Sequence, residues 1–291
     1  MTEVMKARVY PVNSIHGSIG AILVDSGKLS LKDGEQILQY QKEENLRFGE
    51  AAIKLGILTE SDLQFALARQ FDYPYLVKGE SSVSENLVAA YQPFSPQVES
   101  LRALRSQLML RCFTGDSKRK SLAVVSPERG EGRSYIAANL AVVFSQLGAR
   151  TLLIDADMRN PSQDKLFNLQ NRTGLSSILA GRGNEDAIQR VPSFLDLSVL
   201  TSGPIPPNPQ ELIGRPLFSN FLEELESEYD VILIDTPPCS EFAEALTMAV
   251  RAGAAMMVAR KDHSRIALMQ DQIENLMQSG AQVIGTTLNF F

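Results

Sequence analysis

The chain has 291 residues, of which 44% are hydrophobic and 21% are charged, as in a globular protein with room for two cores. Its net charge of −6 argues against a nucleic-acid partner. The two cysteines are far apart, which argues against a disulfide scaffold and favours a reducing compartment, and the two histidines form no metal motif. No apolar run is long enough to span a bilayer, and the start of the chain lacks a signal-peptide core. We therefore expect a cytoplasmic protein that reaches the membrane only through a partner.

The first elements along the chain form an internal repeat. Residues 18–41 align with residues 47–70, and each unit contains a helical segment, a glycine stop and a second helical segment. Ser30 and Thr59 each stand three residues before an Asp, which is the form of a helix N-cap with an acidic first turn. We therefore predict an all-α domain over residues 12–76, in which two helix pairs bury one shared apolar face.

The repeat resembles the N-terminal domain of MshE-type and type II secretion ATPases, in some of which tandem units bind cyclic-di-GMP. The second unit matches that pattern, and the resemblance assigns Arg47, Gly49 and Gln70 to the dinucleotide. The first unit has Ser18 where the pattern has arginine, and serine cannot stack on guanine or pair with phosphate as a guanidinium does. A purely structural four-helix module, or a docking surface, is the alternative that this difference favours.

Residues 77–96 are rich in serine and proline and lack a sustained apolar period, so a linker is predicted there. Strand and helix patterns then alternate over residues 97–291, which indicates an α/β domain with a parallel sheet covered by helices on both faces. The ligand of such a domain lies beyond the carboxyl ends of the strands. Strands are expected near residues 121–126, 151–155, 197–201, 231–235, 254–259 and 282–288, and helices near 99–112, 133–147, 174–180, 216–228, 241–252 and 265–279.

The loop over residues 126–134 has the composition of a phosphate-binding loop. Gly130 and Gly132 allow the backbone to bend and approach phosphate oxygens, while main-chain N–H groups and the start of the next helix supply positive potential. Arg133 would neutralise phosphate charge where lysine is usual, and Ser134 would bind Mg²⁺. A simple strand–helix connection is the alternative. The residues of this loop predicted to contact a nucleotide are Arg129, Gly130, Glu131, Gly132, Arg133, Ser134 and Tyr135.

Two later strands end in carboxylates, Asp155 with Asp157 on one and Asp235 on the other. A buried carboxylate needs a partner, because an unpaired charge is costly to desolvate. Mg²⁺ is the simplest partner for Asp155 and Asp235, and salt-bridged or turn-capping acids are the alternative. With the phosphate loop before them, these strand ends predict a site for a nucleotide and its metal ion.

These segments resemble the bacterial tyrosine kinase family, which belongs with the deviant-Walker P-loop proteins such as MinD. The resemblance covers residues 97–291 and includes the Walker A′ segment from Asp155 to Arg159, the Walker B residue Asp235 and the Gly-Pro-x-Pro-Pro-Asn loop that begins at Gly203. It implies that Asn289, in the last strand, lies near the nucleotide base. The whole chain is similar to the chain-length-determinant (EpsG-type) tyrosine kinases of exopolysaccharide gene clusters, and ATP and Mg²⁺ are the implied cofactors.

The resemblance also implies roles for individual residues. Asp155 would contact the metal ion and, with Asp157, prepare a tyrosine hydroxyl for attack on the γ-phosphate, and Asp235 would hold Mg²⁺ directly or through water. Arg133 completes the predicted catalytic set, since phosphoryl transfer depends mainly on positioning and charge neutralisation.

A helix just before the first sheet strand carries Glu99, Arg102 and Arg105. They match the Glu-x-x-Arg-x-x-Arg pattern that packs subunits of the resembled family into rings, which implies a homo-oligomer. An exposed helix face with local ion pairs is the alternative.

The leading hypothesis is an ATP-dependent tyrosine-kinase-like regulator of exopolysaccharide synthesis or export. A Wzz-like membrane co-polymerase would recruit it to the inner face of the membrane. Arg133 departs from the usual lysine, and none of the seven tyrosines lies in a cluster at the end of the chain, where the family usually carries its phosphorylation sites. Two alternatives therefore stay open, namely a MinD-like ATPase switch without kinase activity and a cyclic-di-GMP-sensing adaptor with a P-loop scaffold.

Overall fold

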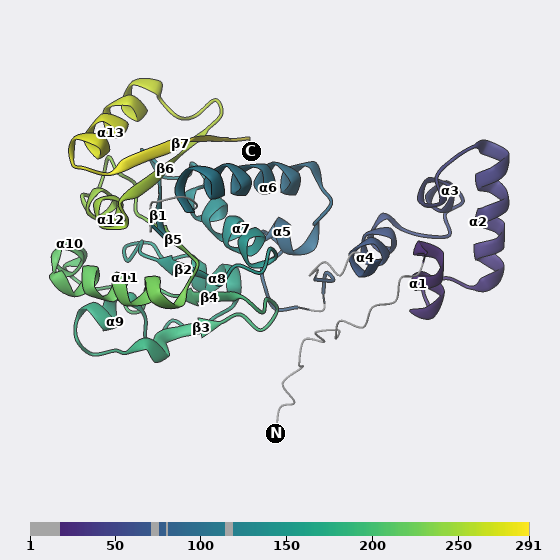
Figure 1. Ribbon diagram of the computed structural model, residues 1–291, viewed down its shortest axis with the longest axis horizontal. Helices are drawn as coiled ribbons and strands as arrows, with labels where there is room; N and C mark the ends of the chain where they lie inside the picture. Colours follow the sequence, from purple (N-terminus) through teal and green to yellow (C-terminus); the bar gives the residue numbers. More distant parts are fainter. Residues whose placement is uncertain (1–17, 71–75, 80, 114–118, 291) are drawn as a thin grey trace.

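The protein is described by a computed structural model that covers residues 18–70, 76–79, 81–113 and 119–290, so the predicted domain boundary at residue 12 lies outside the described residues. Four helices form a group of their own at the start of the described chain (Figure 1). They are α1 (Ile19–Asp25), α2 (Leu31–Glu44), α3 (Phe48–Lys54) and α4 (Glu60–Gln70).

The predicted caps of the second helix in each pair are confirmed. The Ser30 hydroxyl accepts a hydrogen bond from the Asp33 N–H at 3.1 Å, and the Thr59 hydroxyl accepts one from the Asp62 N–H at 3.2 Å. A salt bridge of 2.7 Å joins Lys28 of the first unit to Asp62 of the second. The two pairs share one apolar cluster, which contains Ile22, Leu23, Leu29, Ile37, Ala51, Ala52, Leu58 and Ala66.

Residues 77–96 were predicted as a linker, but part of this stretch is packed into the sheet domain. Val83 and Leu87 are buried in the core of the sheet domain, followed by the short helix α5 (Val88–Tyr91). The main-chain N–H of Ala89 donates to the Asn139 side chain at 3.0 Å, and the Tyr91 hydroxyl donates to the Val83 carbonyl. Serine and proline suggested a linker, but the few apolar residues between them anchor this stretch.

Within the described residues, seven strands form one sheet in the order β3-β4-β2-β5-β1-β6-β7, parallel except for the antiparallel edge pair β3–β4. This architecture confirms the predicted α/β fold, and all six predicted strands are present. The short edge strand β3 and its antiparallel pairing were not predicted. The strands are β1 (Ser121–Val125), β2 (Thr151–Asp155), β3 (Ile188–Arg190), β4 (Leu197–Leu200), β5 (Val231–Asp235), β6 (Ala254–Arg260) and β7 (Gln282–Asn289).

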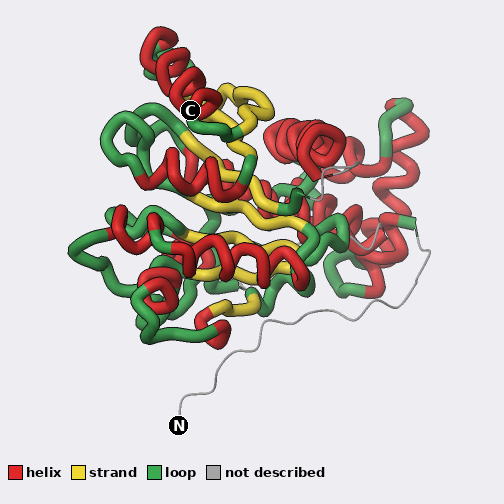
Figure 2. Tube along the Cα trace, turned by 60° about the vertical axis from the view of Figure 1, so that its left-hand side comes forward, coloured by secondary structure: helices red, strands yellow, loops and turns green. Residues whose placement is uncertain are grey.

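Helices cover both faces of the sheet (Figure 2), because alternate residues of the strands point to opposite sides. The remaining helices are α6 (Pro96–Leu108), which continues as a π-helical turn at Met109–Phe113, α7 (Arg133–Ser145), α8 (Gln163–Phe167), α9 (Leu175–Leu179), the 3₁₀ turn Glu185–Ala187, α10 (Pro209–Gly214), α11 (Pro216–Glu228), α12 (Glu244–Ala252) and α13 (Ile266–Gln278). Leu122 and Val124 of β1 face a cluster with α5, α6 and α7, while Ala123 and Val125 face a cluster with α9 to α13.

The sheet topology brings the three candidate segments together. Strands β2, β5 and β1 are consecutive in the sheet, and each ends at the same edge because all three are parallel. Asp155 is the pairing partner of Asp235, and Asp235 is also paired with Val124 at the end of β1. Both aspartates and the loop that follows β1 therefore meet at one edge of the sheet.

Candidate functional site

The loop between β1 and α7 bends at its two glycines, as predicted. Gly130 and Gly132 have φ values of +75° and +89°, in the left-handed region that glycine adopts at little cost. Gly132 is the N-cap of α7, so the first main-chain N–H groups of this helix lie at the loop. The loop has the conformation and the helix start that a phosphate-binding loop requires.

A buried acid within this loop, Glu131, holds the loop in place through hydrogen bonds. One of its carboxylate oxygens accepts the main-chain N–H of Glu128 at 2.7 Å, and the other accepts the hydroxyl of Ser264, which precedes α13. The Asn289 side chain donates to the Glu131 carbonyl at 3.2 Å. Glu131 and Asn289 were predicted as nucleotide contacts, and in this structure both hold the loop to strands and loops outside it.

Arg133 is the buried cation of the site. Its guanidinium donates to the Ser126 hydroxyl at 2.7 Å and to the Asp157 carboxylate at 3.3 Å, and its Nε lies 3.5 Å from Asp235 Oδ1. The side chain is 8% exposed. Arginine can bridge these three groups because its donors are spread over a planar fork, which a lysine ammonium does not have. Sequence reasoning missed the part that Ser126 plays here.

The side chains of Asp155 and Asp235 are fully buried next to each other. Burial raises the pKa of Asp155, and the neighbouring charge of Asp235 raises it further. Burial also raises the pKa of Asp235, against the lowering effect of Arg133. Two carboxylates held in this way are costly without a cation, so the pair is suited to bind one.

Asp157, two residues beyond the end of β2, faces the same space. Its Oδ1 accepts the main-chain N–H of Asn160 at 2.9 Å, while its Oδ2 faces the Arg133 guanidinium. Burial raises the pKa of this carboxyl, and the Asn160 N–H and the Arg133 charge lower it. The turn after β2 therefore brings both Asp155 and Asp157 to the site, although their side chains would diverge on a straight strand.

Besides Ser126, two further residues of the site were not predicted. Gln163, at the start of α8, is fully buried, and its side-chain amide donates to Asp235 at 2.8 Å and to the Ser134 carbonyl at 3.2 Å. Glu244 of α12 binds the Arg159 guanidinium at 2.6 Å. Glu244 contacts the site from an element far along the chain, and Gln163, although only eight residues after Asp155, reaches Asp235 through the order of the strands, so no local sequence pattern indicates their roles.

Other predicted residues of the sheet domain lie around the site. Arg129 is half exposed and forms a 2.9 Å ion pair with Glu241. The Tyr135 hydroxyl accepts a hydrogen bond from the Gln97 side chain at 2.9 Å, and burial raises the pKa of this tyrosine. Both residues therefore connect the loop or α7 to neighbouring elements.

The residues predicted for oligomer contact lie on α6. Arg102 pairs with Glu99 at 3.1 Å within the helix, and the Arg105 guanidinium donates to the Val143 carbonyl of α7 at 2.7 Å. Arg105 thus helps to fix α6 against α7. The role of the three side chains between subunits stays a prediction.

The residues predicted for cyclic-di-GMP lie at the start of α3 and the end of α4. Arg47 is the N-cap of α3, and Gln70 is the last residue of α4. A Cβ at Gly49 would lie 2.8 Å from the end of the Leu63 side chain, which would have to move to admit any other residue. Binding of cyclic-di-GMP stays a prediction.

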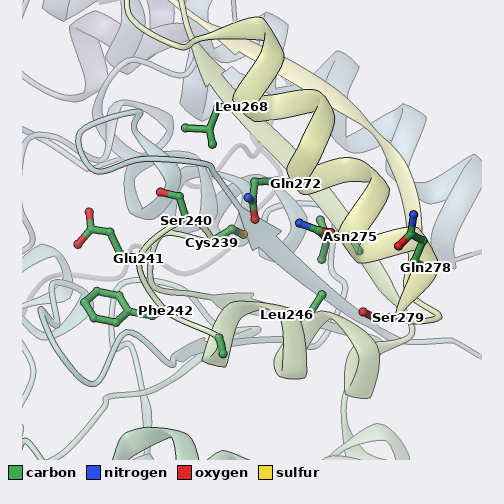
Figure 3. Close-up of a pocket in the computed structure, with 12 residues that line it drawn as sticks. Cys239, Ser240, Glu241, Phe242, Leu246, Leu268, Gln272, Asn275, Gln278 and Ser279 are labelled. Atoms are coloured by element: carbon green, nitrogen blue, oxygen red, sulfur yellow. The ribbon is translucent and has the colours of Figure 1, made fainter.

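A groove of about 690 Å³ lies between α12 and α13, next to the loop that follows β5 (Figure 3). Gln272 and Asn275 of α13 and Leu246 of α12 line it, with Cys239 and Ser240 of the loop. Burial raises the pKa of the Cys239 thiol to about 12, so this cysteine stays protonated at neutral pH. None of the predicted nucleotide-contacting residues lines the groove.

Comparisons with known proteins agree with this geometry. A family model described as "ParA: NUBPL iron-transfer P-loop NTPase" matches residues 117–290. The putative tyrosine-protein kinase CapB of Staphylococcus aureus is 33% identical over 214 residues, which are 74% of this chain and 92% of CapB. The tyrosine-protein kinase Wzc of Salmonella typhimurium is 34% identical over 70% of this chain, but the chain spans only 28% of Wzc.

Among solved structures, the chimerical protein CapA2B2 is similar to this chain, with a TM-score of 0.67 and 36% identity over 77% of this chain and 96% of CapA2B2. In the part of the chain that the structure describes, no helix is long and apolar enough to cross a membrane. The residues that the family model matches, 117–290, include the phosphate loop and both carboxylate strand ends. The chain belongs to the bacterial tyrosine-protein kinase family, within the ParA-type P-loop NTPases.

Proposed function

We propose that this protein is an ATP-dependent tyrosine kinase that regulates exopolysaccharide chain length, polymerisation or export. One observation carries the proposal. The helix start at Gly132, the buried cation Arg133 and the paired carboxylates Asp155 and Asp235 come together at the carboxyl ends of the central strands. Relatives with the same domain are named tyrosine-protein kinases, which selects this activity among those that P-loop proteins perform.

The donor set fits a magnesium ion. Asp155 Oδ1 and Asp235 Oδ1 are buried and lack hydrogen-bond partners among the described residues, and carboxylate oxygens are the ligands that Mg²⁺ prefers. No three His, Cys, Asp or Glu side chains of the described residues form a complete metal site. This agrees with a nucleotide-bound Mg²⁺, which uses one or two carboxylates together with phosphate oxygens. We propose Ser134, Asp155 and Asp235 as its protein ligands, and when bound the ion would neutralise phosphate charge.

The roles of the remaining residues follow from their chemistry. The loop from Arg129 to Tyr135 would hold the phosphates, mainly through main-chain N–H groups, and Asn289 would lie near the base. Asp155 and Asp157 would orient the tyrosine hydroxyl and accept its proton. A carboxyl with a raised pKa is a better proton acceptor than an ordinary one, and burial raises the pKa of Asp157, which is not among the proposed Mg²⁺ ligands. Arg133 would stabilise the transferring phosphoryl group.

The partners are inferred from the family resemblance. A Wzz-like membrane co-polymerase would recruit the protein to the inner face of the membrane. Subunits would associate through Glu99, Arg102 and Arg105 of α6. Since Glu99 is largely exposed, its carboxylate is accessible to a second subunit.

The proposal is tested by incubating the protein with a cytoplasmic fragment of the co-polymerase, Mg²⁺ and γ-labelled ATP. We expect label on tyrosine of one of the two proteins, and no label with Asp155→Asn. Absence of both ATP binding and incorporated label would contradict the proposal. Release of labelled phosphate without phosphotyrosine would favour an ATPase switch, the function for which Arg133 in place of lysine argues.

A further inference from the structure

Gln163 touches each part of the candidate metal site. It begins α8 and is fully buried, and the structure brings it against both strand-end carboxylates and the first turn of α7. Its main-chain N–H donates to Asp155 Oδ2 at 2.9 Å. Its side-chain amide donates to Asp235 Oδ2 at 2.8 Å and to the Ser134 carbonyl at 3.2 Å.

These contacts divide the oxygens of the two carboxylates into two classes. The Oδ2 atoms of Asp155 and Asp235 both accept hydrogen bonds from Gln163. The Oδ1 atoms of both are buried and have no hydrogen-bond partner in the described chain. Together with the Ser162 N–H, which also donates to Asp155 Oδ2 at 2.9 Å, Gln163 fixes the rotation of both carboxylates. Among the residues that the structure describes, Asp155 Oδ1 is left without a hydrogen-bond partner, and Asp235 Oδ1 faces the Arg133 Nε at 3.5 Å, a cation that Mg²⁺ would have to share this oxygen with or replace.

The orientation of the amide is determined by its neighbours. Both groups within hydrogen-bond distance of the side-chain nitrogen, Asp235 Oδ2 and the Ser134 carbonyl, are acceptors, so the NH₂ end must face them. The amide is also neutral. It can hold Asp235 without adding a third negative charge beside Asp155, which a glutamate of the same length would do.

From this geometry we infer that Gln163 is a positioning residue of the metal site, which presents Asp155 Oδ1 and Asp235 Oδ1 to the Mg²⁺ of the bound nucleotide. This inference rests on the proposed function for the identity of the ion. Residues that orient metal-binding carboxylates typically change metal affinity about 10–100-fold when they are replaced. Its side-chain bond to Ser134 also ties the carboxylates to the first turn of α7, where the third proposed ligand stands.

The test is the magnesium dependence of nucleotide binding, measured by titration calorimetry with ADP in the presence of EDTA or of increasing Mg²⁺. In Gln163→Leu the affinity for metal-free ADP should stay as in the wild type. The Mg²⁺ concentration that produces half of the Mg²⁺-dependent change in ADP affinity should rise about tenfold or more. Gln163→Asn, like Gln163→Leu, keeps the main-chain bond to Asp155, and its side chain is too short to reach Asp235, so it should show a similar rise. It also serves as the second variant if Gln163→Leu does not fold.

The matched control is Gln189→Leu, because the Gln189 side chain also makes two hydrogen bonds, to the Gln170 main chain at the β3 edge of the sheet. This variant should keep the wild-type Mg²⁺ dependence. An unchanged Mg²⁺ dependence in Gln163→Leu or Gln163→Asn would overturn the inference, as would wild-type nucleotide binding that ignores Mg²⁺. Failure of the proposed kinase activity can be told apart from failure of this inference about Gln163, because the binding assay requires no phosphoryl transfer.

Discussion

Asp155 and Asp235 are paired residues at the ends of the adjacent strands β2 and β5, and both carboxylates are completely buried. The sheet therefore places two acids side by side next to the Arg133 guanidinium, whose Nε lies 3.5 Å from Asp235 Oδ1. Such an arrangement is expensive in the nucleotide-free protein and becomes favourable when a divalent cation binds. The cost of the free site and its function have the same origin.

The first prediction concerns the cost of this pair. Asp155→Asn should raise the melting temperature of the nucleotide-free protein by a few degrees and abolish its further stabilisation by Mg²⁺·ADP, since a stability gain of 1 kcal/mol corresponds to about 2–4 °C in a domain of this size. Scanning calorimetry with and without Mg²⁺·ADP measures both effects. A variant that is less stable than the wild type, or still stabilised by Mg²⁺, would contradict this account.

The same pair predicts the pH dependence of stability. Because burial raises the pKa of both carboxyls above the ordinary value of 3.8, the folded protein binds more protons than the unfolded chain. The contribution of the pair is therefore fully present below pH 3.8 and is lost as the pH rises through the folded-state values. Denaturant unfolding of the wild type and of Asp155→Asn across this range should show a difference that grows with pH, and a constant difference would argue against this mechanism.

The second prediction concerns Arg133. Arg133→Ala should weaken ATP binding about tenfold or more, because hydrogen bonds to charged groups contribute roughly 1.5–3 kcal/mol. Arg150→Ala is the control, since Arg150 forms an exposed pair with Asp230 at the opposite end of β2. Equilibrium binding of a fluorescent ATP analogue measures the effect. Unchanged affinity in Arg133→Ala would mean that main-chain N–H groups alone hold the phosphates, or that the loop binds no nucleotide.

The third prediction concerns the approach of Gly174 to the loop that begins at Gly203. A Cβ at Gly174 would lie 2.2 Å from the Thr201 carbonyl oxygen and 2.3 Å from the Gly203 nitrogen, and neither main-chain atom can move easily. Gly174→Ala should therefore destabilise the protein by about 1–3 kcal/mol. At Gly214, in α10, a Cβ meets no atom within 4 Å, so Gly214→Ala should be neutral or slightly stabilising. Urea unfolding of both variants checks the contrast, and equal effects would be evidence against the close approach.

The fourth prediction concerns the helical repeat. Asp62 caps α4 through Thr59 and pairs with Lys28 of the first unit, so Asp62→Ala should destabilise residues 18–70 by about 1–2 kcal/mol. Burial opposes ionisation of Asp62, but the bonds from Lys28 and Thr59 lower its pKa overall. The contribution should accordingly be present above pH 3.8 and be lost as the pH falls through the lower folded-state value.

Hydrogen exchange of α1 and α4 in the full chain measures this effect. The exposed acid Glu35 of α2 is a suitable control, and Glu35→Ala should leave exchange in both helices unchanged. If exchange in α4 rises but exchange in α1 does not, the two units do not stabilise each other through the Lys28–Asp62 bridge.

The strand ends and the phosphate loop could be predicted because each is a local pattern, a β-branched run followed by polar residues or glycine. The helix caps at Ser30 and Thr59 were predictable for the same reason, since a cap lies within one helical turn. Gln163 could not be found in this way, because its partner Asp235 is far away in the chain and reaches it only through the order of the strands. The linker prediction over residues 77–96 failed because burial of Leu87 and Tyr91 depends on the surface of α7 and not on local composition.

The most direct test of the central claim is a crystal structure of the protein with Mg²⁺ and a non-hydrolysable ATP analogue. The account predicts phosphates at the N-terminus of α7 and a metal ion about 2.0–2.1 Å from its ligand oxygens, with Asp155 Oδ1 or Asp235 Oδ1 bound directly or through water. An analogue bound away from Gly132, or a metal ion that is bound to neither aspartate, directly or through one water, would contradict it.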